Sequence, residues 1–312
     1  MQPPTFDPGL TQKYTGALKR VINESGSFNV RRKGITWRDR HPYLFLISTS
    51  WRVFAGMVVA VFAITNILFA SLYMAIGIEH LKGAESASAG LEFVNAFFFS
   101  THTLTTVGYG NIYPVGPVAN LVAALEALVG LMGFAVITGL MFGRFSRPSA
   151  RIGFSDRMLV TPYGEGTSLQ FRIVNRRTNN LLELNARLLL MTVEDGSEGL
   201  RRKYVPLQLE RDQVLFFPLT WTVVHPITES SPLYGKSAGD LRDIQAEIMI
   251  LIKAFDETFG QTVNVRHSYR HDEIAWGGKF TTAFEIDEPS GDLRLEVDRV
   301  SSFEAVSLPR LD

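Results

Sequence analysis

The sequence predicts an α+β membrane protein, in which two transmembrane helices flank a short re-entrant helix and a glycine-rich loop, and a β-sandwich follows. Three observations support this fold class. Two segments of the 312-residue chain are long and apolar enough to span a bilayer, and a shorter apolar segment between them runs into TTVGYG. The second half of the chain consists of short alternating runs bounded by turn residues.

The charge distribution separates the two halves of the chain. Residues 1–149 hold 12 Lys and Arg against 7 Asp and Glu, a net charge of +5, whereas residues 150–312 hold 19 against 24, a net charge of −5. The chain has no cysteine, which excludes a disulfide scaffold, thiolate zinc sites and cysteine catalysis. The basic residues form no continuous tract, so we expect no nucleic-acid partner.

The first elements precede the membrane. We expect residues 1–36 to form an N-terminal segment and residues 37–48, WRDRHPYLFLIS, to form an interfacial helix. This stretch places basic residues before Tyr43 and Phe45, and aromatic residues beside basic ones are typical of a membrane surface. Pro42 disfavours one continuous helix, and an ordinary linker is the alternative.

Two segments are long enough to span the membrane. Residues 53–78 contain no charged residue, and residues 118–142 contain only Glu126. A helix needs roughly 20 apolar residues to cross a bilayer core, so each segment is sufficient. The first segment is not a cleaved signal peptide, because it begins too far from the N-terminus and is too long.

The flanking charges predict the orientation of the spans. Basic residues lie before the first span and after the second: Arg31, Arg32, Lys33, Arg38, Arg40 and Arg52, then Arg144, Arg147 and Arg151. The connection between the spans holds only Lys82 against Glu79, Glu85 and Glu92. The positive-inside rule therefore places both termini in the cytoplasm. The absence of cysteine agrees with a large cytoplasmic second half.

The connection contains an apolar segment that is too short to span. Residues 93–104, FVNAFFFSTHTL, are typical of a re-entrant or interfacial helix, and they run directly into TTVGYG. Non-helical backbone at membrane depth is tolerated only inside protein or facing a water-filled cavity. One polar loop cannot enclose a path across the membrane, so we expect several copies of the chain around one axis.

The second half reads as a β-sandwich over residues 151–312, after a linker at 146–150. The expected strands are residues 169–173, 184–193, 204–209, 214–224, 247–254, 262–266 and 293–297. No glycine-rich dinucleotide-binding motif follows a strand, so a nucleotide-binding Rossmann regulator is not expected.

The loop between the spans resembles the potassium-channel selectivity filter. The residues concerned are Thr105, Thr106, Val107, Gly108, Tyr109 and Gly110. The resemblance implies that backbone oxygens of residues 106–109, with a threonine hydroxyl, replace the water shell of a potassium ion. Sodium-selective or nonselective relatives vary the residue that is Tyr109 here, so this tyrosine argues for potassium. A chance match of the motif in an ordinary extracellular loop is the alternative. The short helix before the loop would point its negative end at the ion path, which favours a cation.

Longer matches make the chain similar to the prokaryotic inward-rectifier potassium channels, the KirBac group. They include AFFFSTHTLTTVGYG, GLMFGRFSRPSA, WTVVHPITESSPLYG and VRHSYRHDEIAWGGKF, within a resemblance over about residues 31–280. The resemblance implies a homotetramer in the bacterial inner membrane, with residues 37–48 as a slide helix and residues 49–145 as the pore domain. It also implies that the sandwich is immunoglobulin-like and cytoplasmic, and that potassium is the permeant ion without any cofactor.

Three other functions are weaker. A potassium uptake transporter carries four span–pore–span units in one chain, whereas this chain has one. A membrane-tethered binding protein would leave the TTVGYG loop unexplained. An enzyme is the weakest alternative, because no nucleophile–base motif is present.

Phe134, Thr138 and Phe142 recur every four residues and so share a face of the second span. The family resemblance implies that this face lines the cavity and that Phe142 closes it near the cytoplasm; lipid-facing or interhelical packing is the alternative. Strongly rectifying relatives carry an acidic residue where Phe134 stands, so we expect weak rectification. A cavity-facing Glu126 would supply that charge instead.

Gly130 and Gly139 match family positions discussed as hinges, although close helix packing explains many such glycines. His102 and Glu126 are polar groups in apolar surroundings and are expected to support the filter. Many relatives carry Glu where His102 stands. A neutral ring that donates one hydrogen bond is favoured there over a pH-dependent filter.

The resemblance implies binding of anionic lipids, including phosphoinositides, near the inner leaflet. The candidate residues are Arg31, Arg32, Lys33, Arg52, Arg144 and Arg147, with Arg144 and Arg147 best placed. His267 and His271 share one face of an expected strand, but only Asp272 and Glu273 lie beside them, so no metal site is expected.

Overall fold

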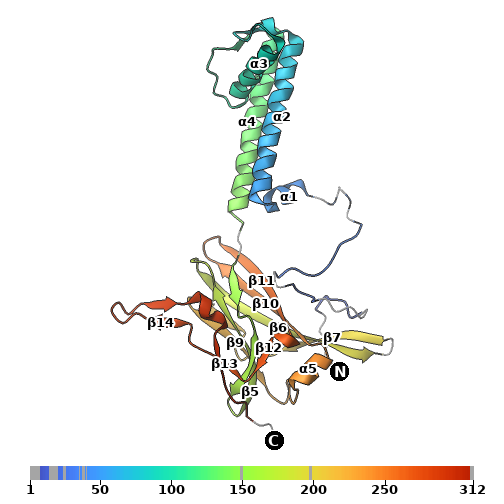
Figure 1. Ribbon diagram of the computed structural model, residues 1–312, viewed down its shortest axis with the longest axis vertical. Helices are drawn as coiled ribbons and strands as arrows, with labels where there is room; N and C mark the ends of the chain where they lie inside the picture. Colours follow the sequence, from blue (N-terminus) through green and yellow to red (C-terminus); the bar gives the residue numbers. More distant parts are fainter. Residues whose placement is uncertain are drawn as a thin grey trace. The chain divides into compact units, whose positions relative to one another are not determined.

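The computed structural model describes residues 8–13, 20–23, 26–34, 36, 39, 41–147, 150–196 and 199–309 (Figure 1). It divides into two compact units. The helical unit comprises Arg32–Arg147, and the β unit comprises Met1–Arg31 together with Pro148–Asp312. Of the expected interfacial helix, Trp37, Arg38 and Arg40 lie outside the described residues.

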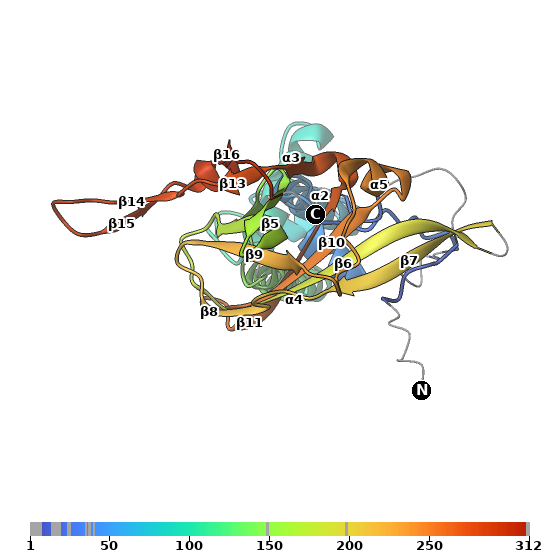
Figure 2. The same cartoon turned by 90° about the horizontal axis from the view of Figure 1, so that it is seen from below.

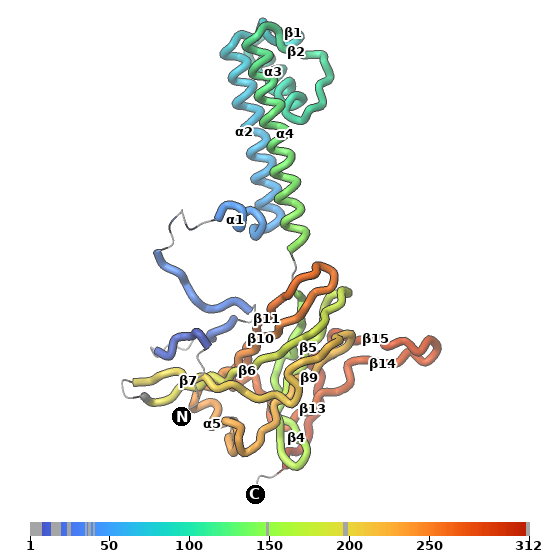
Figure 3. Tube along the Cα trace, turned by 180° about the vertical axis from the view of Figure 1, so that it is seen from behind, coloured from blue at the N-terminus to red at the C-terminus, as the bar shows by residue number. Residues whose placement is uncertain are grey.

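Two long helices dominate the helical unit, α2 (Trp51–Ile76) and α4 (Pro117–Phe145), and they run alongside each other (Figures 1 and 3). Both are long and apolar enough to cross a membrane, with 26 and 29 residues. Most of their apolar side chains are exposed on the single chain, since only 17% and 6% of the most apolar windows are buried. Helices that are apolar all round require lipid or further protein around them.

Local sequence signals move the helix ends away from the expected bounds. Helix α2 ends two residues before position 78, because Gly77 adopts a φ of 112°. Helix α4 continues three residues beyond position 142 before Ser146 ends it. The short helix α3 (Ala89–Leu104) begins four residues before position 93, because Ser88 caps it and accepts a hydrogen bond from the Leu91 amide at 3.4 Å.

Within the expected interfacial segment, helix α1 (Pro42–Ser48) begins at Pro42, the residue expected to interrupt a longer helix. Proline fits the first helical position, because the amide hydrogen that it lacks has no partner there in any helix. A one-turn 3-10 helix, η2 (Ile78–His80), follows α2.

A small ribbon closes the connection between the spans. Strand β1 (Leu81–Lys82) pairs antiparallel with β2 (Tyr113–Pro114), and both ends of the α3–loop segment therefore meet (Figure 3). The buried core of the helical unit lies beside this ribbon and consists of Ala70, Tyr73, Leu81, Ala84, Ala96 and Phe99. The core thus fixes α3 against the second half of α2.

The β unit is a sandwich of two five-stranded sheets, as predicted (Figure 2). The first sheet contains β3 (Ile152–Phe154), β4 (Met158–Tyr163), β5 (Gly166–Asn175), β9 (Thr220–Ile227) and β12 (Ile274–Trp276). The second contains β6 (Leu181–Gly196), β7 (Gly199–Leu207), β8 (Gln213–Phe216), β10 (Glu247–Asp256) and β11 (Gln261–Arg270). Buried side chains of both sheets, such as Phe171 and Ile250, form one core.

Two strand predictions were wrong. The expected strand at 214–224 is two strands, because Pro218 has no amide hydrogen for a sheet ladder. Strand β8 pairs with β6, whereas β9 pairs with β5, so the chain changes sheets at this proline. The expected strand at 293–297 ends at Leu295 and, among the described residues, pairs with the short strand β14 (Phe284–Ile286) outside both five-stranded sheets.

The remaining elements of the β unit lie outside the two five-stranded sheets. They are α5 (Ala238–Asp243), η3 (His271–Glu273), η4 (Val297–Ser301), and the paired strands β13 (Gly278–Phe280) with β16 (Phe303–Ala305) and β14 (Phe284–Ile286) with β15 (Leu293–Leu295). The β14–β15 hairpin projects from the sandwich (Figure 2).

The N-terminal segment is attached to the second sheet of the β unit. The buried Glu247 carboxylate accepts hydrogen bonds from the Val21 and Ile22 amides at 3.2 and 3.5 Å. The Arg20 guanidinium lies 2.7 Å from the Glu273 carboxylate. These contacts connect residues 20–22 to β10 and to η3.

Candidate functional site

The TTVGYG loop follows directly from the carboxyl end of α3. Thr105 caps the helix, and its amide donates to Thr101 O at 3.1 Å. The Val107 and Gly108 amides both donate to His102 O, at 2.8 and 3.3 Å. The last turn of α3 thus supplies the acceptors for the loop amides, so these N–H groups face the helix.

The loop backbone alternates in handedness. Thr106, Gly108 and Gly110 have φ values of 61°, 56° and 78°, whereas Val107 and Tyr109 between them are not in the positive-φ region. Alternation of this kind orients successive peptide groups alike. Glycine adopts positive φ without cost, but a β-branched threonine does so only under strain, which is typical of functional sites.

This geometry leaves a row of oxygen atoms on the side away from α3. Within the described part of the chain, no hydrogen-bond donor reaches the carbonyl oxygens of Thr106, Val107, Gly108 or Tyr109. The carboxyl end of α3 adds the negative end of a helix dipole behind them. Such a row of backbone oxygens is suited to a dehydrated cation.

His102 supports the loop through two groups. Its carbonyl accepts the two loop amides, and its ring meets the Tyr109 ring edge to face at 4.8 Å between centroids. The Tyr109 side chain is nevertheless 73% exposed on the single chain. The site therefore lacks a covering surface on the side away from α3.

Glu126 lies behind α3 in a buried polar cluster. Tyr73 OH donates to Glu126 Oε2 at 2.7 Å, and Ser100 Oγ is within hydrogen-bond distance of Glu126 Oε1. Ser100 Oγ also lies 3.0 Å from Asn66 Oδ1. Glu126 is fully buried, so it does not share the exposed α4 face of the expected cavity residues. Sequence reasoning missed Asn66, Tyr73 and Ser100, although a lone asparagine in an apolar span was a signal.

Gly130 makes a close contact rather than an evident bend. A Cβ atom at this position would lie 2.0 Å from Leu104 O, the carbonyl at the end of α3. Helix α4 runs unbroken through Gly130 and Gly139. The geometry therefore favours close helix packing over a hinge as the role of Gly130. At Gly139, by contrast, an added Cβ atom would meet no atom within 4 Å.

The three expected cavity residues lie on the exposed surface of α4. Phe134 and Phe142 are 71% and 73% exposed, and Thr138 is exposed between them. A groove of about 590 Å³ lies between α2 and α4, and Phe134 lines it together with Thr105 and Thr106 at the base of the loop. Phe134 and the loop thus share one hollow.

Arg144 is occupied by protein contacts. Its guanidinium donates to Leu46 O and to Thr49 O, the latter at 2.7 Å, and lies 4.5 Å from the Trp51 ring centroid. These contacts connect α4 to the end of α1 and the start of α2. Arg31, Arg32, Lys33, Arg52 and Arg147 are exposed.

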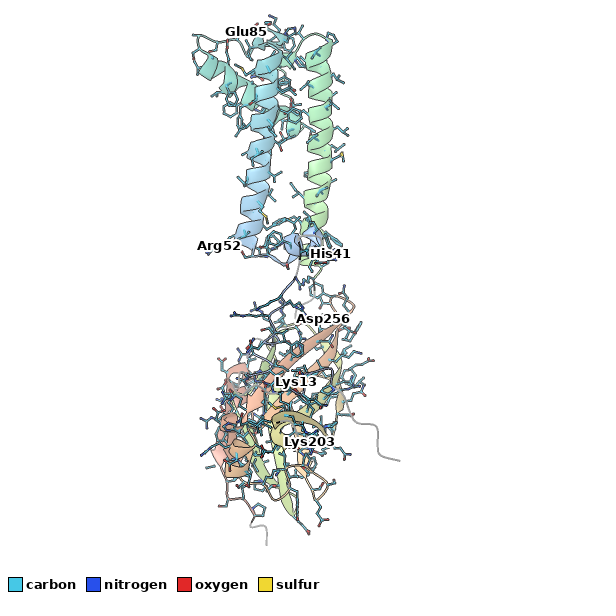
Figure 4. The ribbon with its side chains drawn as sticks, turned by 90° about the vertical axis from the view of Figure 1, so that its right-hand side faces the viewer. Lys13, His41, Arg52, Glu85, Lys203 and Asp256 are labelled. Atoms are coloured by element: carbon cyan, nitrogen blue, oxygen red, sulfur yellow. The ribbon has the colours of Figure 1, made fainter. Side chains whose placement is uncertain are left out.

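Charge separates the two ends of the helical unit. Arg52 and His41 lie at one end and Glu85 at the other (Figure 4).

In the β unit, His267 stacks on the Phe154 ring at 4.5 Å, and the described residues contain no group of three His, Cys, Asp or Glu that suits a metal ion.

Two membrane-length helices that hold between them a half-helix and a loop of unpaired carbonyl oxygens define the pore unit of a cation channel. Residues 57–147 match the family model described as "Ion channel", and residues 152–312 match "Inward rectifier potassium channel C-terminal domain". The chain belongs to the inward-rectifier potassium channel family, which is a family of channels and not of enzymes.

Two relatives illustrate the similarity. The chain is 39% identical over 280 residues to "Inward rectifier potassium channel Kirbac3.1" of Paramagnetospirillum magnetotacticum, covering 86% of this chain and 93% of that protein. It is 27% identical over 331 residues to "G protein-activated inward rectifier potassium channel 3" of Homo sapiens, covering 97% of this chain and 82% of that protein.

Gly130→Ala should destabilise the protein by about 1–3 kcal/mol, because the added methyl group meets the Leu104 carbonyl in a packed contact. Gly133→Ala is the matched control on the same helix, since its Cβ meets nothing within 4 Å. Thermal unfolding of the purified protein in detergent, followed by tryptophan fluorescence, measures both. Equal midpoints for the two variants would contradict the packing role.

Proposed function

We propose that the protein is a homotetrameric, potassium-selective channel that conducts passively. The alternating backbone of the TTVGYG loop, with carbonyl oxygens free of internal donors, is the observation that supports this function best. Thr106, Val107, Gly108 and Tyr109 supply oxygen ligands to potassium, with Thr105 and Gly110 at the two ends of the filter. Rings of such oxygens replace the hydration shell, so the ion enters without a large desolvation cost.

Four copies of the chain complete the site. One loop presents oxygens on one side only, and Tyr109 and Val107 are 73% and 51% exposed on the single chain. The apolar faces of α2 and α4 likewise need covering by neighbours and by lipid. Four loops around one axis surround the ion, and the buried side of each loop remains fixed to its own α3.

The inner part of α4 forms the gate in this proposal. Phe142 lies about two helical turns beyond Phe134 on a similar face, so four Phe142 rings narrow the path below the cavity. A ring of phenyl groups excludes water and thereby stops ions. Gly139 lies one turn before Phe142 and serves as the hinge in this account.

The charges of the helical unit support an orientation with both termini in the cytoplasm of a bacterium and the connection between the two spans at the outer side of the inner membrane. The exposed Arg31, Arg32, Lys33, Arg52 and Arg147 bind anionic lipid headgroups, including phosphoinositides. Arg144 instead acts as an anchor that carries motion of α1 to α4. The net charge of −5 in residues 150–312 attracts potassium to the cytoplasmic mouth.

Gly108→Ala should reduce barium-sensitive rubidium uptake into proteoliposomes at least about tenfold, because an alanine at a φ of 56° is strained by roughly 1–2 kcal/mol and distorts the oxygen row. Gly164→Ala is the matched control: Gly164 has the same φ of 56° but lies in a turn of the β unit. Uptake of potassium and of sodium by the unmutated protein is measured in the same assay. Equal uptake of both ions, or full uptake by Gly108→Ala, would contradict the filter assignment.

Phe142→Ala should raise basal rubidium uptake several-fold, because a wider ring no longer excludes water from the path. Val136→Ala serves as control, since Val136 is also exposed but faces another direction on α4. Unchanged or lower uptake in a tetramer that elutes normally would exclude Phe142 as the constriction.

Voltage-dependent block by internal spermine should be shallow, and Phe134→Asp should steepen it. Four carboxylates in a low-dielectric cavity attract a polycation strongly, whereas phenyl rings offer about 0.5–2 kcal/mol of cation–π attraction. Glu126 does not supply the missing charge, because it is buried behind α3. Phe134→Asn removes the ring without adding charge, and recordings from planar bilayers compare the three. Steep block in the unmutated channel would overturn this account of weak rectification.

A further inference from the structure

The helical unit contains a buried carboxyl group without a basic partner. Glu126 of α4 is 0% exposed, and no salt bridge of the described residues includes it. Its neighbours are three further buried polar side chains: Asn66 and Tyr73 of α2, and Ser100 of α3, at 0%, 1% and 0% exposure. The cluster thus joins all three long helices of the unit, and its hydrogen atoms can be assigned one by one.

The amide of Asn66 has only one acceptable orientation. Its Nδ2 donates to the Phe62 carbonyl at 2.7 Å. The reverse orientation would bring two acceptor oxygens to that distance, which is repulsive. Asn66 Oδ1 therefore faces Ser100 Oγ, 3.0 Å away, and needs a hydrogen from it.

Ser100 has a single hydroxyl hydrogen, yet its Oγ contacts two oxygen atoms, Asn66 Oδ1 and Glu126 Oε1. If the hydroxyl donates to Asn66, the hydrogen between Ser100 and Glu126 must come from the carboxyl group. Tyr73 OH donates to the other carboxyl oxygen, Oε2, at 2.7 Å. A protonated carboxyl group satisfies every one of these contacts. A carboxylate would instead take the single Ser100 hydrogen, and Asn66 Oδ1 would then face a lone pair of Ser100 Oγ.

We propose that Glu126 is a neutral carboxylic acid that donates to Ser100, and that the chain Tyr73–Glu126–Ser100–Asn66 positions the pore helix. The neutral form also removes the cost of an unpaired charge at membrane depth. The four side chains are positioning residues, because none of them contacts the ion path. Their effect on conduction rests on the proposed function, whereas the protonation of Glu126 does not.

The chain positions α3 together with a second contact. Ser100 and Leu104 are one turn apart on α3, and Glu126 and Gly130 are one turn apart on α4. The Glu126–Ser100 hydrogen bond and the Gly130–Leu104 contact therefore fix two successive turns of one helix against two of the other. The second of these turns holds His102, whose carbonyl binds the filter amides.

Infrared spectroscopy of the purified protein tests the protonation directly. At neutral pH, Glu126→Gln should remove one carbonyl band of a protonated carboxylic acid from the difference spectrum against the unmutated protein. Glu85→Gln is the control, since Glu85 is an exposed carboxylate paired with Lys82, and its replacement should leave the band region of protonated carboxylic acids unchanged. Absence of the acid band in the Glu126→Gln difference would overturn the proposal.

Rubidium and sodium uptake into proteoliposomes tests the positioning role. Glutamine has both a donor and an acceptor, so Glu126→Gln should keep the rubidium-to-sodium ratio within about twofold, whereas Glu126→Leu and Ser100→Ala should lower it at least about fivefold. Ser71→Ala is the matched control, because the Ser71 hydroxyl donates to Ile67 O within its own helix.

Two results would contradict the positioning role: glutamine as damaging as leucine in an assembled tetramer, or Ser100→Ala with unchanged selectivity. If the Glu126→Leu variant does not assemble, the selectivity of Ser100→Ala alone decides whether the positioning role holds. Unmutated protein that takes up sodium as fast as rubidium would refute the proposed function alone, and the infrared result would still decide the state of Glu126.

Discussion

The bilayer interior contains no water to satisfy polar backbone groups, and the TTVGYG loop must therefore find its hydrogen-bond partners within the protein. The structure meets this requirement on one side only. The carbonyl of His102 accepts the amides of Val107 and Gly108, and so the loop depends on the last turn of α3. The carbonyl oxygens on the other side have no donor among the described residues, and a dehydrated potassium ion supplies the missing partner in our account.

Because the loop depends on α3, the positions of its atoms depend on how α3 is held. The β1–β2 ribbon joins the two ends of the connection, and Tyr73 packs its ring against Phe99 at 5.2 Å between centroids. Gly130 then lets α4 approach the carboxyl end of α3 more closely than any larger residue permits. The polar cluster around Glu126 adds direction to this packing, since hydrogen bonds fix rotation as well as distance.

The elements that could be predicted from the sequence are those with a local signal. Uninterrupted apolar runs identify α2 and α4, and the motif identifies the loop. The observed helix ends differ from the predicted ones where one residue ends or begins the helix. Examples are the Ser88 cap of α3 and the positive φ of Gly77 after α2. Pro218 and a lone asparagine in an apolar span are local signals, but they mark positions and not partners. The pairing of β8 and β9 with different sheets, and the meeting of Asn66, Tyr73 and Ser100, depend on residues far apart in the chain. The occupation of Arg144 by the carbonyls of Leu46 and Thr49 was hidden for the same reason.

Anomalous X-ray scattering from crystals grown in rubidium tests the central claim most directly, because it locates the ions relative to the oxygen row. We predict a line of anomalous peaks on a four-fold axis, between the carbonyl oxygens of residues 106 and 109 of four chains. Crystals grown in sodium and subsequently soaked in rubidium should gain the same peaks. Peaks confined to other positions, or an assembly whose loops do not face a common axis, would contradict the account.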